Sequence, residues 1–161
     1  MRGTEQEKFM LKALEEARKA LAKEEVPVGC VIVKDGKILA KGHNLRESKK
    51  NSLGHAEIIT INKACKKLKN FRLEECDMYV TLEPCLMCSG AIVQSRIRKV
   101  YFGAHDEKYG AVESVAKAFD IKSNHLVDYG SGILADECSE IIKEFFRKLR
   151  KRNKEESKKD V

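Results

Sequence analysis

Two short motifs, about thirty residues apart, carry the side chains that could do chemistry: HAE at residues 55–57 and PCLMC at residues 84–88. A Cys-x-x-Cys pair alone can be a redox couple, half of a structural zinc site or two ligands of a catalytic metal. One imidazole and two thiolates together form a ligand set that suits zinc. Because the redox interpretation gives Glu57 no role, we favour a metal site.

The number of ligands distinguishes a structural zinc site from a catalytic one. A structural site normally has four protein ligands, whereas a catalytic site has three and a water. His55, Cys85 and Cys88 make three. The remaining candidates either lie outside the motifs or lack paired ligand spacing: Cys65, Cys76, His43, His105 and His125. We therefore expect a catalytic site with an open fourth position.

Glu57 is the candidate proton carrier. Residues two apart in a regular helix point about 200° away from each other, so His55 and Glu57 can share a site only where a helix is just starting. Zinc lowers the pKa of a coordinated water to about 7, and a carboxylate beside that water can take its proton and deliver it to a substrate. The alternative is a Glu that only complements the positive end of a helix. The nearby Cys motif favours the catalytic interpretation, and the combination resembles the signature of zinc nucleoside and nucleobase deaminases.

The elements that must position these motifs follow from periodicity and turn chemistry. Both motifs are expected to open a helix, where free N–H groups and partial positive charge stabilise thiolates. The HAE segment contains a β-branched run that favours a strand locally, but its apolar spacing and length favour a helix. The expected elements are a helix from the capping box at 4–7, a hairpin over 28–40 turning at Asp35-Gly36, a loop over 41–54, a helix over 55–70, strands over 78–82, 100–103 and 126–129, and helices over 86–95 and from 134 onward.

Composition bounds the class of protein. The 161 residues indicate one α/β domain, and 35% of them are charged, with a net charge of +7. Such a charge indicates an anionic partner, with nucleic acid the leading candidate, although a merely well-solvated surface remains the alternative. The charged N-terminus and the absence of a run of about 20 apolar residues predict a cytoplasmic protein without membrane contact. Residues 145–161 hold eight Lys or Arg against three Asp or Glu, and we expect 153–161 to form a basic, frayed tail after a domain spanning 1–152.

From about Phe9 to Arg150 the chain resembles the bacterial tRNA-specific adenosine deaminases, which convert the wobble adenosine of an anticodon to inosine. The similarity is spread over nearly the whole domain, and is therefore more specific than two metal motifs. The matching stretches are EEVPVG (24–29), GHN (42–44), HAEI (55–58), YVTLEPCLMCSGAI (79–92), SRIRKVYFGAHDEKYGA (95–111), NH (124–125), GILADEC (132–138) and FFRKLR (145–150).

The resemblance implies a three-layer α/β/α fold of the cytidine-deaminase type with a central mixed five-stranded sheet. It also implies a homodimer whose partner subunit helps form the site for the tRNA anticodon loop, and one zinc per subunit on the three motif ligands, with Glu57 as proton shuttle. The substrate contacts that it implies are Asn44 on the flipped adenine, Val28 lining the base pocket, the Pro84 backbone accepting the leaving amine, Asp106 and Lys108 beside the flanking nucleotides, and Phe145 and Arg147 on the anticodon loop.

Three residues depart from the family pattern. His105 stands where the family often has Arg, Glu113 where it usually has Gly, and Cys30 where it commonly has a small residue. The first two are expected to affect substrate affinity rather than chemistry. Cys30 is expected to be a small buried hydrophobic residue.

Two other functions remain open from the sequence. A free-base deaminase acting on guanine or cytosine shares both motifs, but does not predict the basic tail or the match over 95–111. A structural zinc module that binds nucleic acid without catalysis accounts for the cysteines but gives Glu57 no task.

Overall fold

The computed structural model describes residues 3–159. Its centre is a five-stranded sheet with the strand order β2-β1-β3-β4-β5. The strands are β1 (Gly29–Lys34), β2 (Lys37–His43), β3 (Cys76–Leu82), β4 (Lys99–Ala104) and β5 (Asp128–Ser131). β1 runs antiparallel to β2 and β3, whereas β3, β4 and β5 are parallel, so the sheet is mixed as expected.

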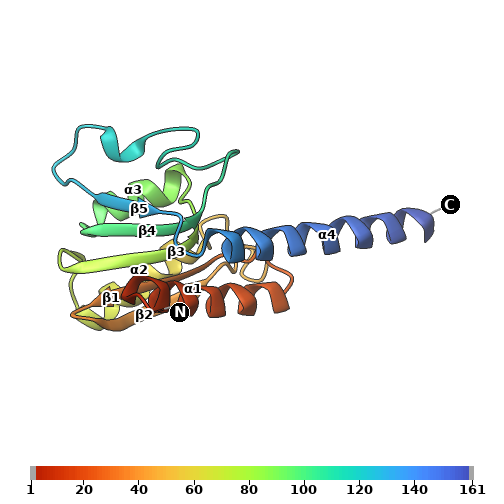
Figure 1. The fold of residues 1–161 in the computed structure, drawn as a ribbon, viewed down its shortest axis with the longest axis horizontal. Helices are drawn as coiled ribbons and strands as arrows, with labels where there is room; N and C mark the ends of the chain where they lie inside the picture. Colours follow the sequence, from red (N-terminus) through yellow and green to blue (C-terminus); the bar gives the residue numbers. More distant parts are fainter. Residues whose placement is uncertain (1–2, 160–161) are drawn as a thin grey trace.

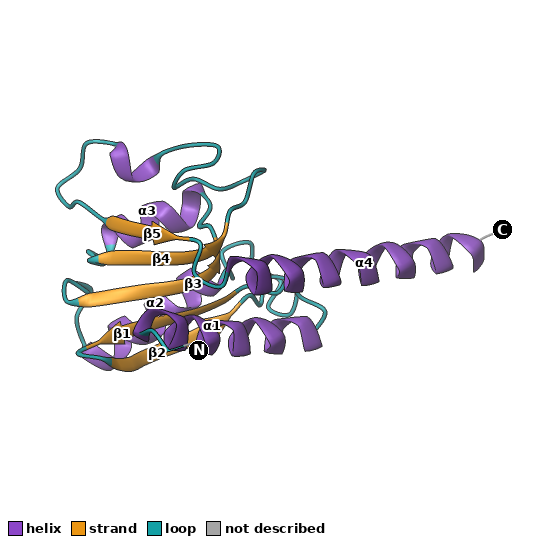
Figure 2. Ribbon diagram, viewed as in Figure 1, coloured by secondary structure: helices purple, strands orange, loops and turns teal. Residues whose placement is uncertain are grey.

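Helices cover both faces of the sheet (Figures 1 and 2). α1 (Glu5–Ala22) and α4 (Ala135–Lys159) contact each other and one face. α2 (Ala56–Leu68) and α3 (Leu86–Gln94) contact each other on the opposite face, with a short 3-10 helix (Ala118–Asp120) against α3. β1 alternates between two hydrophobic cores, since Cys30 and Ile32 pack on the α2 side and Val31 and Val33 on the α1 side. The three-layer α/β/α fold is therefore confirmed.

Local sequence signals account for most element boundaries. The Thr4 hydroxyl accepts a hydrogen bond from the Glu7 amide at 3.0 Å and caps α1. Asp35 and Gly36 both have positive φ, as the two-residue hairpin turn between β1 and β2 requires. α2 is a helix despite its β-branched run, because Thr60 and Ile61 are buried on its inner face.

Several boundaries differ by one to three residues from those expected, and the differences at β2 and β5 have a clear cause. β2 continues to His43 instead of ending at 40, because Lys41, Gly42 and His43 pair with β1. β5 spans 128–131 rather than 126–129, and Leu126 is 81% exposed. Only the polar end of the predicted apolar strand pairs with β4.

The C-terminal segment also differs from expectation. α4 continues as a helix through Lys159, where a frayed tail was expected over 153–161; residues 160–161 lie outside the described part. No Gly or Pro interrupts this stretch, and Arg152 forms an ion pair with Glu24 at 3.0 Å. The side chains of residues 153–159 are all exposed, and the helix projects from the body (Figure 1). Within residues 3–159, no helix is long and apolar enough to span a membrane.

Candidate metal centre and catalytic site

The two motifs lie at two helix starts, as predicted. His55 is the N-cap of α2 and Cys85 is the N-cap of α3, each with extended backbone dihedral angles. Neither side chain caps its own helix, so both remain available for other partners. Glu57 and Cys88 follow in the first turns, where His55 and Glu57 can face the same site.

The three predicted ligands lie together. The His55 Nδ1 atom is 3.6 Å from the Cys85 Sγ atom and 3.5 Å from the Cys88 Sγ atom. All three ligand atoms lie within 4.8 Å of one another, and no other group of three such residues was found within residues 3–159. Usual Zn–S and Zn–N bond lengths with tetrahedral angles place a nitrogen and a sulfur ligand about 3.6 Å apart. These separations therefore fit a metal ion of zinc's size and geometry.

The electrostatics of this cluster favour an anionic sulfur beside a cationic partner. The hydrogen bond from Cys88, together with the adjacent His55, lowers the pKa of Cys85 to about 4. The same hydrogen bond and burial raise the pKa of Cys88, which carries the shared proton. The pKa of His55 is raised, mainly by its hydrogen bond to Cys85. A divalent cation can replace these protons, since thiolates and neutral imidazole are its ligands.

Glu57 is buried beside the ligands. Its side chain is 4% exposed, and burial, reinforced by the Cys85 charge, raises its pKa to about 7. Cys30 lies close to Glu57 and is fully buried, which raises the pKa of its thiol well above the ordinary range. The prediction that Cys30 is a small buried residue is confirmed, and Glu57 is the buried carboxylate of the centre.

Asn44 and Val28, predicted to bind the base, are neighbours. The Asn44 amide donates to the Val28 carbonyl at 3.0 Å, and its side-chain amide donates to the Val26 carbonyl at 3.1 Å. The Asn44 Oδ1 atom also accepts from the Arg46 amide at 3.1 Å. Asn44 is thus fixed by the backbone, and retains one side-chain N–H and one acceptor position for a ligand.

Asp106 and Lys108, predicted to contact flanking nucleotides, lie in the loop after β4. Asp106 Oδ1 accepts from the amides of Lys108 and Tyr109, each at 3.1 Å, so its carboxylate shapes the loop. The exposed Lys108 lies over the Tyr109 ring at 5.3 Å from its centre.

The Pro84 carbonyl, predicted to accept the leaving amine, already accepts a hydrogen bond from the Ala111 amide at 2.9 Å. It is therefore a link between the loop and the start of α3. On α4, Phe145 is buried and Arg147 pairs with Glu140 at 2.7 Å. The adjacent Phe146, which the sequence did not single out, is 40% exposed.

The other histidines have hydrogen-bonding partners and none is near the three ligands. His43 Nδ1 lies 3.0 Å from the buried Glu16 carboxylate, and His125 Nε2 lies 2.7 Å from the Ile97 carbonyl. His105 Nε2 lies 3.0 Å from Glu113 Oε2, so two of the three departures from the family pattern contact each other.

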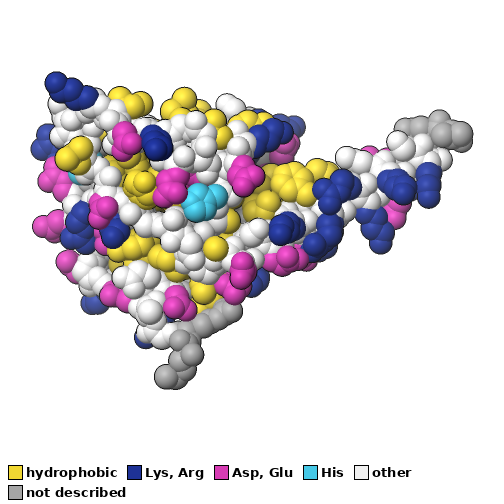
Figure 3. Space-filling view, turned by 45° about the horizontal axis from the view of Figure 1, so that its top comes forward, with side chains coloured by type: hydrophobic (Ala, Val, Ile, Leu, Met, Phe, Trp, Pro, Cys, Tyr) yellow, Lys and Arg dark blue, Asp and Glu magenta, His cyan; other side chains and the backbone are white. Residues whose placement is uncertain are grey.

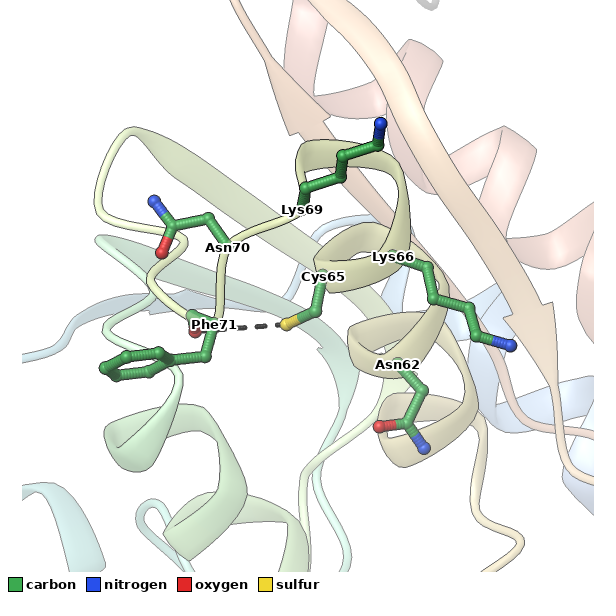
Figure 4. Close-up of a pocket in the computed structure, with 6 residues that line it drawn as sticks. All are labelled: Asn62, Cys65, Lys66, Lys69, Asn70 and Phe71. Atoms are coloured by element: carbon green, nitrogen blue, oxygen red, sulfur yellow. Dashed lines mark hydrogen bonds between the residues drawn. The ribbon is translucent and has the colours of Figure 1, made fainter.

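An open hollow of about 700 Å³ lies at the far end of α2 (Figure 4). Helical rise places its centre about 15 Å from His55. The Cys65 sulfur points from this end of the helix toward the Phe71 carbonyl, 3.8 Å away. Cys65 is therefore no part of the metal cluster. The hollow is lined by Asn62, Cys65, Lys66, Lys69, Asn70 and Phe71.

One functional candidate was missed by sequence reasoning. Glu83, between β3 and the ligand helix, is 2% exposed and accepts hydrogen bonds from several residues of the loop after β4. Although burial raises its pKa, the hydrogen bonds from Ser114, Glu113 and Asp106 bring the pKa below its ordinary value. A charged residue directly after a buried strand was the signal that could have indicated it.

An α/β/α fold with a His, two Cys and a buried Glu at two adjoining helix starts defines the class of zinc-dependent deaminases. A family model described as MafB19-like deaminase matches residues 4–150. The tRNA-specific adenosine deaminase of Bacillus subtilis (strain 168) is 47% identical over 152 residues, covering 94% of each chain. The chain belongs to the MafB19-like deaminase family, among relatives named tRNA-specific adenosine deaminase.

Two solved structures bear on the choice of substrate. One, from a study of A-to-I editing by tRNA:A34 deaminases at the wobble position of transfer RNA, is 45% identical with a TM-score of 0.81, covering 83% of this chain and 98% of that chain. The other, guanine deaminase from Bacillus subtilis, is 31% identical with a TM-score of 0.61, covering 90% and 93%. Sequence and structure are both more similar to the tRNA deaminase.

Proposed function

We propose that this protein hydrolytically deaminates the wobble adenosine of a tRNA anticodon to inosine. The observation that carries the reaction type is the buried Glu57 beside the three convergent ligands His55, Cys85 and Cys88. The choice of tRNA as substrate is supported by the relatives, which match over nearly the whole chain. A tRNA substrate also accords with the expected cytoplasmic location.

His55, Cys85 and Cys88 would hold one zinc ion per subunit. When bound, zinc supplies a water whose pKa is close to 7. Glu57 takes a proton from the attacking water and gives it to N1 of adenine as the water oxygen bonds to C6. Glu57 then carries the second proton to the amino group on C6, the C–N bond breaks, and ammonia leaves inosine behind. The burial of Glu57 keeps bulk water away from these transfers.

The predicted substrate contacts would hold the flipped base and its neighbours. Asn44 has a free donor and acceptor for the edge of the adenine, and Val28 lies next to it. Arg46 is close enough to His55 to oppose the rise in the pKa of the imidazole, so a positive charge stands beside the site. Such a charge suits a phosphate of the bound RNA.

The basic part of α4 supports RNA binding. Lys and Arg side chains gather along its projecting part in the space-filling view (Figure 3). Residues 145–161 include eight of them, and these would contact phosphates outside the anticodon. Phe145 is buried, so we assign any aromatic contact on this helix to Phe146 and keep Arg147 as a charge contact.

The expected homodimer also remains part of the proposal. Leu86, beside Cys85, is 64% exposed, and Leu53, two residues before His55, is 54% exposed. A partner subunit could cover these two side chains and complete the site. Multi-angle light scattering would show a mass of twice 18.3 kDa if this is correct, and a monomer at micromolar concentration would refute it.

The test of the activity uses zinc-loaded protein and four substrates. An anticodon stem-loop with adenosine at the wobble position should yield inosine and one equivalent of ammonia. Free adenine, guanine and cytosine should yield none, and a stem-loop with guanosine at the wobble position serves as a matched control. Ammonia released only from a free base would instead establish the guanine- or cytosine-deaminase alternative. The similarity to a guanine deaminase, at 31% identity, is the reason for including these bases.

A further inference from the structure

One buried carboxylate anchors the loop that carries Asp106 and Lys108. Glu83 accepts hydrogen bonds at Oε1 from the Asp106 amide at 3.1 Å and at Oε2 from the Val112, Glu113 and Ser114 amides at 3.1, 2.8 and 2.9 Å. The Ser114 hydroxyl donates a fifth, to Oε1. These donors lie at both ends of one loop, so the Glu83 carboxylate connects the two ends.

The same anchor is tied to the metal ligands through the chain. Glu83 is two residues before Cys85, and Pro84 between them accepts the Ala111 amide. A Cβ atom on Gly110 would lie 2.4 Å from the Glu83 carboxyl carbon, so the loop fits around this carboxylate only with glycine there. The position of the loop is thereby fixed relative to the start of α3.

The second half of the loop is also attached to the body of the protein, because Val112 is part of a hydrophobic core and Ala111 is buried, whereas the first half has fewer attachments. The Asp106 carboxylate bonds only the amides of Lys108 and Tyr109 within its own turn. The side chains at positions 107–109 are exposed, so they contribute little burial to hold the loop. Charge-assisted hydrogen bonds to the buried Glu83 carboxylate therefore join the exposed half of the loop, at Asp106, to its buried half.

We propose that Glu83 is a positioning residue for substrate binding: it holds the 105–114 loop, with Asp106 and Lys108, at a fixed place beside the metal ligands. This inference rests on the proposed function, because the loop is assigned to the nucleotides that flank the target adenosine. Glu83 itself touches no reacting atom and acts through the loop.

Glu83→Gln tests the proposal, because the amide keeps the shape of the side chain but loses the charge and one acceptor oxygen. Hydrogen–deuterium exchange of the zinc-loaded protein should accelerate at least tenfold in peptides covering 105–114, and stay unchanged in β1 and β2. KM for the stem-loop should rise about tenfold, while kcat changes less than about threefold. Zinc content should remain at one per chain.

Two other variants and a charge control complete the series. Ser114→Ala removes one donor and should raise KM about two- to threefold. Gly110→Ala displaces the carboxylate sterically and should act in the same direction as Glu83→Gln. Glu74→Gln removes an equal charge from an exposed position before β3 and should change neither exchange nor KM. If Glu83→Gln does not fold, Ser114→Ala and Gly110→Ala carry the test.

The outcomes separate this inference from the proposed function. Unchanged exchange over 105–114 overturns the anchoring role, and faster exchange with unchanged KM overturns the role in substrate binding. If the wild-type protein forms no inosine, the proposed function fails. Exchange would then still test the anchor, and fluorescence anisotropy with the same stem-loop would still show whether Glu83→Gln weakens RNA binding about tenfold.

Discussion

The metal cluster and the loop over 105–114 lie side by side but are built differently. The cluster comes from two motifs, each placed by the first turn of its own helix, with His55 and Cys85 as N-caps. The loop has no regular structure over 106–114 and is held by hydrogen bonds to Glu83, more than twenty residues away in the chain. The proposed catalytic residues are therefore positioned locally, and the loop proposed to contact the substrate is positioned at long range.

This difference has a consequence for what each region tolerates. The position of a helix start is set by the packing of the whole helix. The positions of the ligands therefore depend on the hydrophobic core beneath α2 and α3. The loop depends on one ionised carboxylate, and a neutral residue at that position would leave buried amides without partners. Substitutions in the two regions should therefore separate loss of chemistry from loss of binding.

The largest effect is expected from Cys88→Ala. Removal of one of three ligands should reduce zinc from one per chain to near zero and abolish inosine formation. Zinc content by mass spectrometry of the metal checks this. Cys65→Ala is the matched control, because that cysteine lies at the far end of α2 (Figure 4) and should leave zinc and activity intact. Full zinc content in Cys88→Ala would show that the cluster has been assigned wrongly.

Glu57→Gln should greatly lower kcat without changing zinc content or RNA affinity. A general acid–base group contributes about 10²–10⁴ in rate, so kcat should fall by that factor. Zinc content and stem-loop affinity should stay within about twofold of the wild type, since the carboxylate is neither a ligand nor a phosphate contact. A single-turnover assay with anisotropy binding measures both. Wild-type turnover in this variant would show that Glu57 is not the proton carrier, whereas no turnover in the wild type either would favour the structural-zinc alternative.

The metal cluster could be predicted from the sequence, whereas the loop anchor could not. The difference lies in how far apart in the chain the contacting residues are. HAE and PCLMC each bring their side chains together within one helical turn, so spacing alone determines their geometry. Glu83 becomes informative only when β3 and β4 are known to be parallel neighbours whose carboxyl ends meet. The contact between His105 and Glu113 likewise depends on the path of the loop.

Element type was predictable where burial is periodic, whereas element boundaries were not predictable where tertiary pairing decides them. α1, α2 and α3 follow their apolar faces. The end of β2 depends on its pairing with Gly29, and the shift of β5 depends on which residues face Tyr101 and Phe102. α4 continues past Arg152 because its residues favour a helix, although the described segment 153–159 packs against nothing. A polar segment of this kind could equally be helical or frayed, so the sequence pattern could not distinguish the two.

A second buried carboxylate, Glu25, offers a comparison with Glu83. It is fully buried and accepts hydrogen bonds from Ser48 and the Glu47 amide. Burial raises its pKa, but these hydrogen bonds bring the pKa below the ordinary 4.5. Its contribution to stability is therefore present above pH 4.5 and is lost as pH falls through the lower, folded-state pKa.

Glu25→Gln should accordingly destabilise the protein by about 1.5–3 kcal/mol at pH 7, the range for hydrogen bonds to a charged group. The difference from the wild type should shrink as the pH falls below 4.5. Urea unfolding at pH 7 and at pH 3.5 measures it, with Glu74→Gln as the exposed control. An equal loss of stability at both pH values would mean that packing, rather than the charge, is what the variant removes.

The smallest effect concerns Glu113, whose carboxylate faces His105 in the loop over 105–114. Both side chains are partly exposed, so their mutual attraction is weak, and the net negative charge at Glu113 should repel RNA phosphates. Glu113→Gln should tighten stem-loop binding about two- to threefold at low salt, and the gain should disappear at high salt because such charges are screened. The Glu113 amide still bonds Glu83, so the anchor and kcat are unaffected. Weaker binding in Glu113→Gln would show instead that the contact with His105 shapes the loop, and recognition would then depend on two anchors rather than one.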